Sequence, residues 1–194
     1  MNNVIENILT RRSIRAYKED QISEEELNII LESGKFAPSG GNSQTWRFTV
    51  VQNKEKLEHL NSLVREAFKN LEVDEKTYRS KKSGKRAAEN DGYNFYYNAP
   101  TLIIVSNERE YSNCMADSAV AVENILLAAH SIGAGACFIN QLTWFCDDKH
   151  VREALTDMGI PKNYVVCSSA SIGYNSGSMP KASPRKDGTV DRIR

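Results

Sequence analysis

The sequence predicts an α+β fold, in which a sheet is covered by helices and a central helix is buried. Three observations support this prediction. About four segments have the character of strands, helices lie between them in mixed order, and one helical stretch is apolar nearly all round. The 194 residues suffice for one substantial core. We therefore expect a single domain over residues 1–194, with a C-terminal arm from about residue 174.

The first predicted helices lie near the N-terminus. Apolar residues within 4–9 fall on one face of a short helix. Ser23 and Glu26 have the spacing of a capping box, and apolar residues follow at helical spacing. This second helix should end near Gly34, because Pro38 bars its continuation.

The middle of the chain gives a mixed signal. Residues 48–51 predict a strand, and Asn53 can cap a helix whose apolar stripe runs over residues 57–64. From residue 65 to residue 98 the pattern weakens. We expect the charged stretch of residues 81–86 to be a mobile loop, followed by several aromatic residues.

The second half returns to clear patterns. Residues 102–105 predict a strand, and a buried central helix is expected from about residue 115 to residue 132. Residues 136–139 predict the next strand. Asp147 is expected to cap a last amphipathic helix, and residues 165–172 predict the final strand.

Composition excludes several classes of function. The formal net charge is +0, so no overall field attracts the chain to nucleic acid or an anionic membrane. No stretch reaches the roughly 20 apolar residues of a membrane span, and the N-terminus lacks the core of a signal peptide. The cysteines form no C-x-x-C pair, and the histidines lack metal-ligand spacing. We expect a cytoplasmic protein without structural disulfides or a metal site.

Familiar nucleotide and nucleophile motifs do not fit. The sequence has no P-loop, and the glycine-rich residues 133–138 follow a helix and precede a strand, whereas a Rossmann turn needs the opposite order. The spacing around Ser176 misses a nucleophile elbow by one residue.

Two segments remain as candidates for binding. Residues 11–15 place three arginines and a serine together, a set that matches phosphate oxygens but also suits an exposed basic turn. Residues 37–48 form a loop dense in small hydrogen-bonding side chains, closed by Trp46. Its amides can donate and accept, as the edge of a flavin or pyrimidine ring requires, although Trp46 itself fits a core anchor.

These segments, with three others in the same order, resemble the FMN-dependent nitroreductase family over nearly the whole chain. The motifs are Arg11-Arg12-Ser13-x-Arg15, Pro38-Ser39-x-x-Asn42-x-Gln44-x-Trp46-x-Phe48, Asn98-Ala99-Pro100 before an apolar strand, Asp117 through Gly135, and Ile172-Gly173-Tyr174 with Pro184-Arg185-Lys186 beyond. The resemblance implies a mixed sheet covered by helices, in an intertwined homodimer with FMN at the subunit interface.

The resemblance also implies roles for particular residues. The phosphate would be held by Arg11, Arg12, Ser13 and Arg15, with Arg185 returning from the tail. The other subunit would line the flavin with Pro38, Ser39, Asn42 and Gln44, and the ring would lie along Cys137, Phe138 and Ile139. No catalytic side chain is assigned, because the flavin performs the redox chemistry.

The chain departs from the family pattern at Thr45, where the family usually has proline, so the loop turns more freely there. The expected activity is hydride transfer from NADH or NADPH to a nitroaromatic, a quinone or a similar acceptor by a ping-pong mechanism. Specialised branches of the family act in flavin destruction, dehalogenation or azoline oxidation. A flavin-binding sensor or store and a flavin-free basic module are the alternatives outside catalysis.

Overall fold

The computed structural model describes residues 2–194. Its helices are α1 (Asn3–Thr10), α2 (Glu24–Lys35), α3 (Lys54–Lys69), α4 (Arg79–Ala88), α5 (Cys114–Ser131), α6 (Gln141–Phe145) and α7 (Lys149–Asp157). Its strands are β1 (Arg47–Val51), β2 (Thr101–Glu108), β3 (Gly135–Ile139) and β4 (Tyr164–Gly173), and a 3-10 turn covers Gly40–Asn42.

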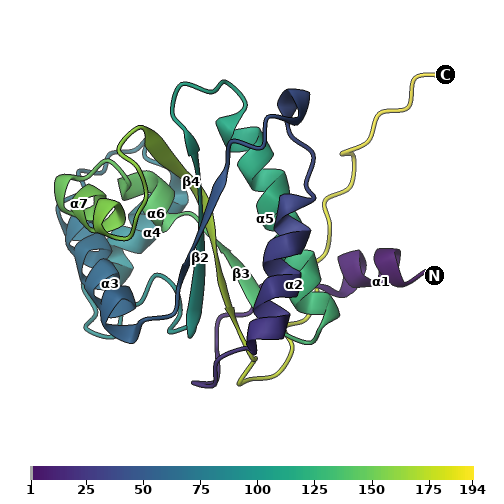
Figure 1. Ribbon diagram of the computed structural model, residues 1–194, viewed down its shortest axis with the longest axis horizontal. Coiled ribbons are helices and arrows are strands. Elements are labelled where there is room, and N and C mark those ends of the chain that lie inside the picture. Colours follow the sequence, from purple (N-terminus) through teal and green to yellow (C-terminus); the bar gives the residue numbers. More distant parts are fainter. Residues whose placement is uncertain (1) are drawn as a thin grey trace.

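The strands form one sheet in the order β1-β2-β4-β3, and each neighbouring pair is antiparallel. Since β4 is antiparallel to both of its neighbours, β2 and β3 run in the same direction on either side of it. A mixed sheet was expected; within residues 2–194 the parallel pairing is a single bridge between Ser13 and Ala136. Helix α5 connects β2 to β3 across one face of the sheet (Figure 1).

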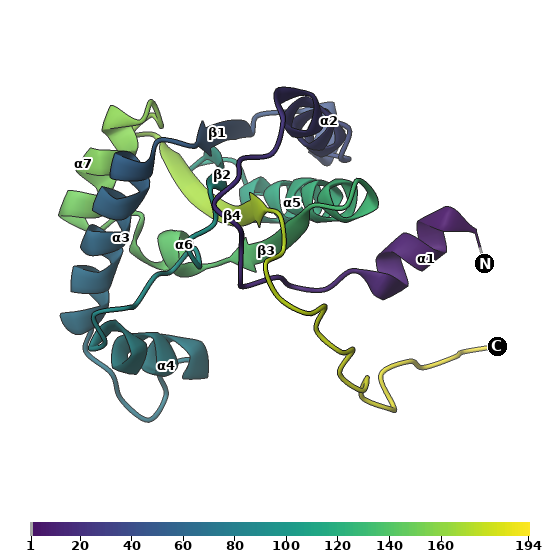
Figure 2. The same cartoon turned by 90° about the horizontal axis from the view of Figure 1, so that it is seen from below.

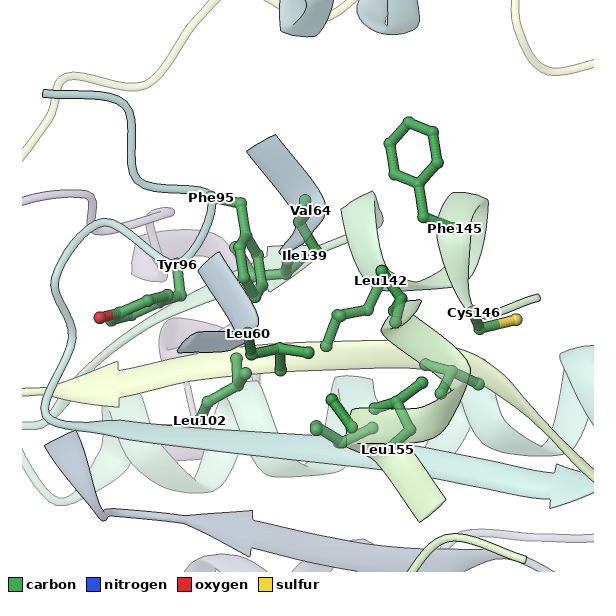
Figure 3. Packing of buried hydrophobic residues seen from close by; sticks show 14 of the residues in the cluster. Leu60, Val64, Phe95, Tyr96, Leu102, Ile139, Leu142, Phe145, Cys146 and Leu155 are labelled. Carbon is green, nitrogen blue, oxygen red and sulfur yellow. The ribbon is translucent and has the colours of Figure 1, made fainter. Parts of the chain in front are cut away.

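Helices cover both faces of the sheet, which confirms the α+β class. Helices α2 and α5 lie on one side, and α3, α4, α6 and α7 lie on the other (Figure 1). Each side has its own buried cluster. On the α3 side, Leu60, Leu142 and Leu155 pack together above the sheet (Figure 3). On the α5 side, Ile103, Ile125 and other apolar residues fill the space between helix and sheet.

The capping box predicted at the start of α2 is confirmed. The backbone N–H of Ser23 donates to the Glu26 carboxylate over 2.7 Å, and the Glu26 N–H donates to the Ser23 hydroxyl over 3.2 Å. The pair satisfies two of the N–H groups that a helix start leaves without partners. This local signal is complete within four residues, so the sequence alone could locate it.

Residues 81–86 form part of helix α4, so the loop expected there is wrong. The helix lacks an apolar stripe, and its contacts with α3 hold it in place. A Cβ at Gly84 would clash with the Phe68 ring, so glycine lets the two helices approach closely. The Lys85 ammonium donates to the carbonyl oxygens of Lys69 and Leu71 over 2.9 and 2.7 Å, at the end of α3 where carbonyls lack helical partners.

The cap of α7 is Asp148 and not Asp147, which corrects the prediction by one residue. The Asp148 carboxylate accepts from the N–H groups of His150 and Val151. Asp147 instead makes a bidentate ion pair with Arg109, which lowers the pKa of the Asp147 carboxyl. The short helix α6 before it was not predicted.

Both ends of the chain extend away from the core (Figure 2). Helix α1 has no buried residue, and the side chains of Val4 and Leu9 are 66% and 57% exposed. Residues 177–194 are exposed along an extended path. No helix within residues 2–194 is both long and apolar enough to cross a membrane.

Candidate functional site

The arginine-rich segment of residues 11–15 lies alongside the start of β3. The Ile14 N–H donates to the Ala136 carbonyl oxygen over 2.9 Å, and the Ile14 side chain is buried. A Cβ at Gly135 would lie 2.9 Å from the Ile14 side chain, so glycine permits this close approach. Because successive side chains of an extended segment alternate, Ser13 and Arg15 point away from the side that Ile14 buries.

Guanidinium donors in this segment remain without partners. Within the described residues, Arg11 Nε and Arg12 Nε are buried and make no hydrogen bond. Arg12 Nη1 donates to the carbonyl oxygens of Leu9 and Arg11, which closes the last turn of α1. A carboxylate oxygen of Glu123 lies 3.7 Å from Arg11 Nε, beyond hydrogen-bond distance. Two cations beside one carboxylate leave the segment positive, as the binding of a phosphate requires.

His130 faces the same segment. Its Nε2 lies 3.0 Å from the Thr10 hydroxyl. Burial lowers the pKa of His130, and the charges of Arg11 and Arg12 lower it further. The ring is therefore disposed to stay neutral beside the arginines.

The polar loop of residues 38–44 has a strained and internally bonded backbone. Asn42 and Gln44 have φ values of 55° and 50°, in the left-handed region that non-glycine residues rarely adopt. The Ser39 hydroxyl accepts from the Gln44 N–H over 3.2 Å, and the Gln44 side-chain amide donates to Asn42 over 2.9 Å. Such strain persists where surrounding contacts fix it, which is frequent at binding sites.

A buried carboxylate on α5 fixes this loop. Asp117, 7% exposed, accepts from the Gly40 N–H over 3.0 Å and from the Tyr111 hydroxyl over 2.7 Å. The Ser43 hydroxyl donates to the Tyr111 oxygen over 2.9 Å. A Cβ at Gly40 would clash with the Asn113 side chain. From the sequence, Asp117 was named only as the start of the central-helix motif, and Tyr111 was given no role; the available signal was an acid in the first turn of a mainly apolar helix.

The two candidate segments contact α5 at different turns. The polar loop bonds to Asp117 in the first turn, whereas Arg11 lies near Glu123 in the middle of the helix and Thr10 meets His130 near the last turn. At about 1.5 Å per residue, Glu123 is roughly 9 Å and His130 roughly 20 Å from Asp117 along the helix axis. Within one chain, the arginine segment and the polar loop therefore meet different parts of the helix.

Comparison with known proteins assigns this arrangement to a family. A sequence model of the nitroreductase family matches residues 8–174. The chain belongs to the nitroreductase family. A crystal structure of a Bacteroides fragilis nitroreductase with bound FMN is 42% identical with a TM-score of 0.90, and the match covers 100% of both chains.

Two further members of the family are similar over most of their length. A crystal structure of a Desulfitobacterium hafniense nitroreductase with bound FMN is 27% identical with a TM-score of 0.84, over 100% of both chains. An Archaeoglobus fulgidus protein, provisionally named NADH dehydrogenase/NAD(P)H nitroreductase, is 34% identical over 90% of this chain and 86% of its own.

In this member of the nitroreductase family, Arg15 contacts both β3 and the aromatic loop before β2. Its guanidinium lies 5.6 Å from the centre of the Tyr97 ring. Burial raises the pKa of the Cys137 thiol, and the nearby Arg15 and Ser13 offset only part of that rise. Cys137 is therefore a neutral thiol at the edge of the arginine segment, unsuited to act as a nucleophile.

The predicted residues of β3 do not share one face. Cys137 and Ile139 are 1% exposed and belong to the cluster on the α3 side, whereas Phe138 between them is 36% exposed. This follows from the alternation of side chains along a strand. A planar ring on one face of β3 can therefore contact the Phe138 side chain, and a ring on the other face can contact Cys137 and Ile139. In either case the ring meets the residues of the opposite face only through their backbone atoms.

Arg185 lies apart from the other predicted residues. It is exposed within the extended tail, and within residues 2–194 no hydrogen bond or ion pair involves it. The backbone of the tail is held at its start, where the Ser176 N–H donates to the Ala16 carbonyl oxygen. The structure thus brings Arg11, Ser13 and Arg15 together with β3 and leaves Arg185 outside that group.

Proposed function

We propose that this chain is an FMN-dependent oxidoreductase that transfers hydride from NADH or NADPH to a nitroaromatic, a quinone or a similar acceptor. The observation that carries the proposal is the arginine segment, with buried donors that lack partners, in a fold whose 42% identical relative binds FMN. The name of the A. fulgidus relative supports a reduced nicotinamide as the electron donor.

The arginine segment supplies what the FMN phosphate needs. Arg11, Arg12 and Arg15 would neutralise its charge, and the Ser13 hydroxyl would donate a further hydrogen bond. Each hydrogen bond to a charged group contributes roughly 1.5–3 kcal/mol. The ring system would then lie along β3, the edge strand of the sheet, with Phe138 on one face and Cys137 and Ile139 on the other.

A second copy of the chain would complete the site. Within one chain the polar loop and the arginine segment contact α5 roughly 9 Å apart along its axis, and Pro38, Ser39, Asn42 and Gln44 would reach the flavin held by the partner. Helix α1 leaves apolar side chains exposed, and a cavity of about 380 Å³ lies between α1, α2 and α5, lined by Val4, Ile8, Ile29 and Leu127 among others. A partner subunit would bury this surface, and Arg185 of the tail would reach the partner's phosphate site.

The chemistry that bound FMN would supply is the acceptance of hydride in one half-reaction and its delivery in a second, a ping-pong sequence. For a nitro acceptor, NAD(P)H, a proton and R–NO₂ give NAD(P)⁺, R–NO and water. The protein's own residues would bind and orient FMN and the substrates and exclude water from the site. No side chain has to form a bond to the substrate, which agrees with the buried, neutral state of Cys137.

Paired variants test the shared site. We would co-express chains carrying Arg15→Ala with chains carrying Asn42→Ala, under two affinity tags, and purify the mixed dimer. If each site combines both chains, one site of the mixed dimer carries both substitutions and the other carries neither. The mixed dimer should therefore regain about half of the wild-type FMN content.

The matched control places both substitutions on one chain and pairs it with a wild-type chain. Each site then carries one substitution, so little FMN should be retained. Equal FMN content in the two mixed dimers would contradict a site built from two chains. A protein that sediments as a monomer and still binds FMN would contradict it directly.

A further inference from the structure

A second pocket lies beside the proposed flavin site, on the α3 side of the sheet. It is formed by α4, the loop before β2 and the start of α6, and its volume is about 610 Å³. Aromatic rings make up much of its wall, from Tyr78, Tyr93, Tyr97 and Trp144. Pockets of this size and character are typical of sites for small organic ligands.

The walls of the pocket are fixed by packing. Trp144 meets Phe68 and Tyr78 edge to face, with ring centres 6.2 and 6.1 Å apart. Tyr97 has φ of 58°, a strained conformation for a bulky residue. The side-chain oxygen of Asn94 accepts hydrogen bonds from the backbone N–H groups of Tyr96 and Asn98 and so fixes the turn of residues 94–98. Contacts within the chain therefore hold Trp144 and the turn that carries Tyr97 in place.

One residue of the pocket, Tyr97, also contacts the arginine segment. Tyr97, which lines the pocket, also lies 5.6 Å below the Arg15 guanidinium. Gln141, another lining residue, begins α6 two positions after the end of β3. A ligand in the pocket would thus lie next to the strand along which we place the flavin ring.

The rim of the pocket carries cations without acidic partners. Helix α4 contains five basic residues and no acidic residue. The ammonium groups of Lys82 and Lys85 are bound by backbone carbonyl oxygens. Arg79 lines the pocket, and Lys81 Nζ lies 5.8 Å from the Trp144 ring centre; within residues 2–194 neither makes an ion pair.

We propose that this pocket binds the organic acceptor and selects planar aromatic acceptors that carry a carboxylate. The aromatic walls would hold the ring of the acceptor, and Arg79 and Lys81 would bind its carboxylate at the rim. This inference rests on the proposed function, since it names the acceptor class of the same site. It changes no step of the reaction and determines which acceptor is brought to the flavin.

A charged and a neutral acceptor of the same shape test the selection. We would compare kcat/KM for 4-nitrobenzoate and 4-nitrobenzamide in the FMN-loaded wild type and in the double variant Arg79→Gln/Lys81→Gln. Exposed ion pairs are weak, so we expect the variant to lose about three- to tenfold in kcat/KM for the carboxylate. Activity with the amide should stay within about twofold, and Lys162→Gln, a remote exposed lysine, should change neither value.

The affinity for the acceptor, measured without turnover, gives a second test. Calorimetric titration of 4-nitrobenzoate into the oxidised protein, with no nicotinamide present, should show the same loss of affinity in the double variant. Equal values for wild type and variant with both acceptors, in kinetics and in calorimetry, would overturn the assigned pocket while the proposed function stands. FMN-loaded protein that NADH or NADPH reduces but that turns over neither compound would overturn the assigned acceptor class, and flavin that neither nicotinamide reduces would instead overturn the proposed function.

Discussion

Replacing Asp117 tests whether the polar loop contributes to FMN binding. Asp117→Ala removes the acceptor for the Gly40 N–H and the shorter of two bonds of the Tyr111 hydroxyl, which also lies 3.1 Å from the Gly40 carbonyl oxygen. Hydrogen bonds to a charged group contribute at least about 1.5 kcal/mol each, so the two bonds together contribute roughly 3 kcal/mol. Part of this free energy is lost from the stability of the fold, and part is lost from the ordering of the polar loop.

The free energy lost from loop ordering weakens FMN binding. A loss of 1.4–3 kcal/mol corresponds to a rise of about 10- to 150-fold in Kd. The assay is titration of the apoprotein with FMN, followed by the change in flavin fluorescence. Urea unfolding of the apoprotein, measured in parallel, gives the share that falls on global stability.

Asp148→Ala provides the matched control. Asp148 also accepts two hydrogen bonds, from His150 and Val151, but it caps α7 on the other side of the sheet. Its loss should cost about 1 kcal/mol of stability and leave the Kd for FMN unchanged. If Asp117→Ala and Asp148→Ala gave the same Kd as wild type, the reasoning that links the loop to the cofactor would be refuted.

Three other predictions concern the arginine segment and α4. Arg15→Ala should raise the Kd for FMN about 10- to 100-fold. Arg47→Ala also removes an arginine that lies over a tyrosine ring, and it should leave the Kd unchanged. If both variants bound FMN as tightly as the wild type, Arg15 would not belong to the site. The pKa of His130 lies below about 6.5, so the apoprotein should lose stability as pH falls from 6.5 toward that lowered value. FMN phosphate should raise this pKa, and an NMR titration unchanged by FMN would place the phosphate elsewhere. Gly84→Val should push α4 from Phe68 and cost about 1–3 kcal/mol, so an unchanged Tm would contradict the close packing.

Elements with local signals could be predicted from the sequence. The capping box of α2 is complete between Ser23 and Glu26, and the apolar stretch of α5 is long enough to identify a buried helix. Helix α4 could not be predicted in this way, because its stability comes from Gly84 against Phe68 and from Lys85 bound to the end of α3. Those contacts depend on the tertiary fold and leave no periodic pattern.

The candidate site shows the same division. The arginines of residues 11–15 and the amides of residues 38–44 stand out by composition, so both segments could be selected from the sequence. The bond from Asp117 to the loop could not be predicted, because its partner Gly40 is 77 residues away in the chain. Exposure of α1 and separation of the two segments along α5 are likewise properties of the folded chain.

Flavin binding and reduction are tested together by the visible absorption spectrum of the purified protein, recorded without oxygen before and after addition of NADH or NADPH. We expect flavin bands that bleach with at least one of the two nicotinamides and return when a nitroaromatic or a quinone is added. Flavin bands that persist with both nicotinamides would contradict the proposed NAD(P)H-dependent activity and indicate a flavin-binding sensor or storage protein. Protein that takes up no FMN when the cofactor is supplied would contradict the flavin site itself.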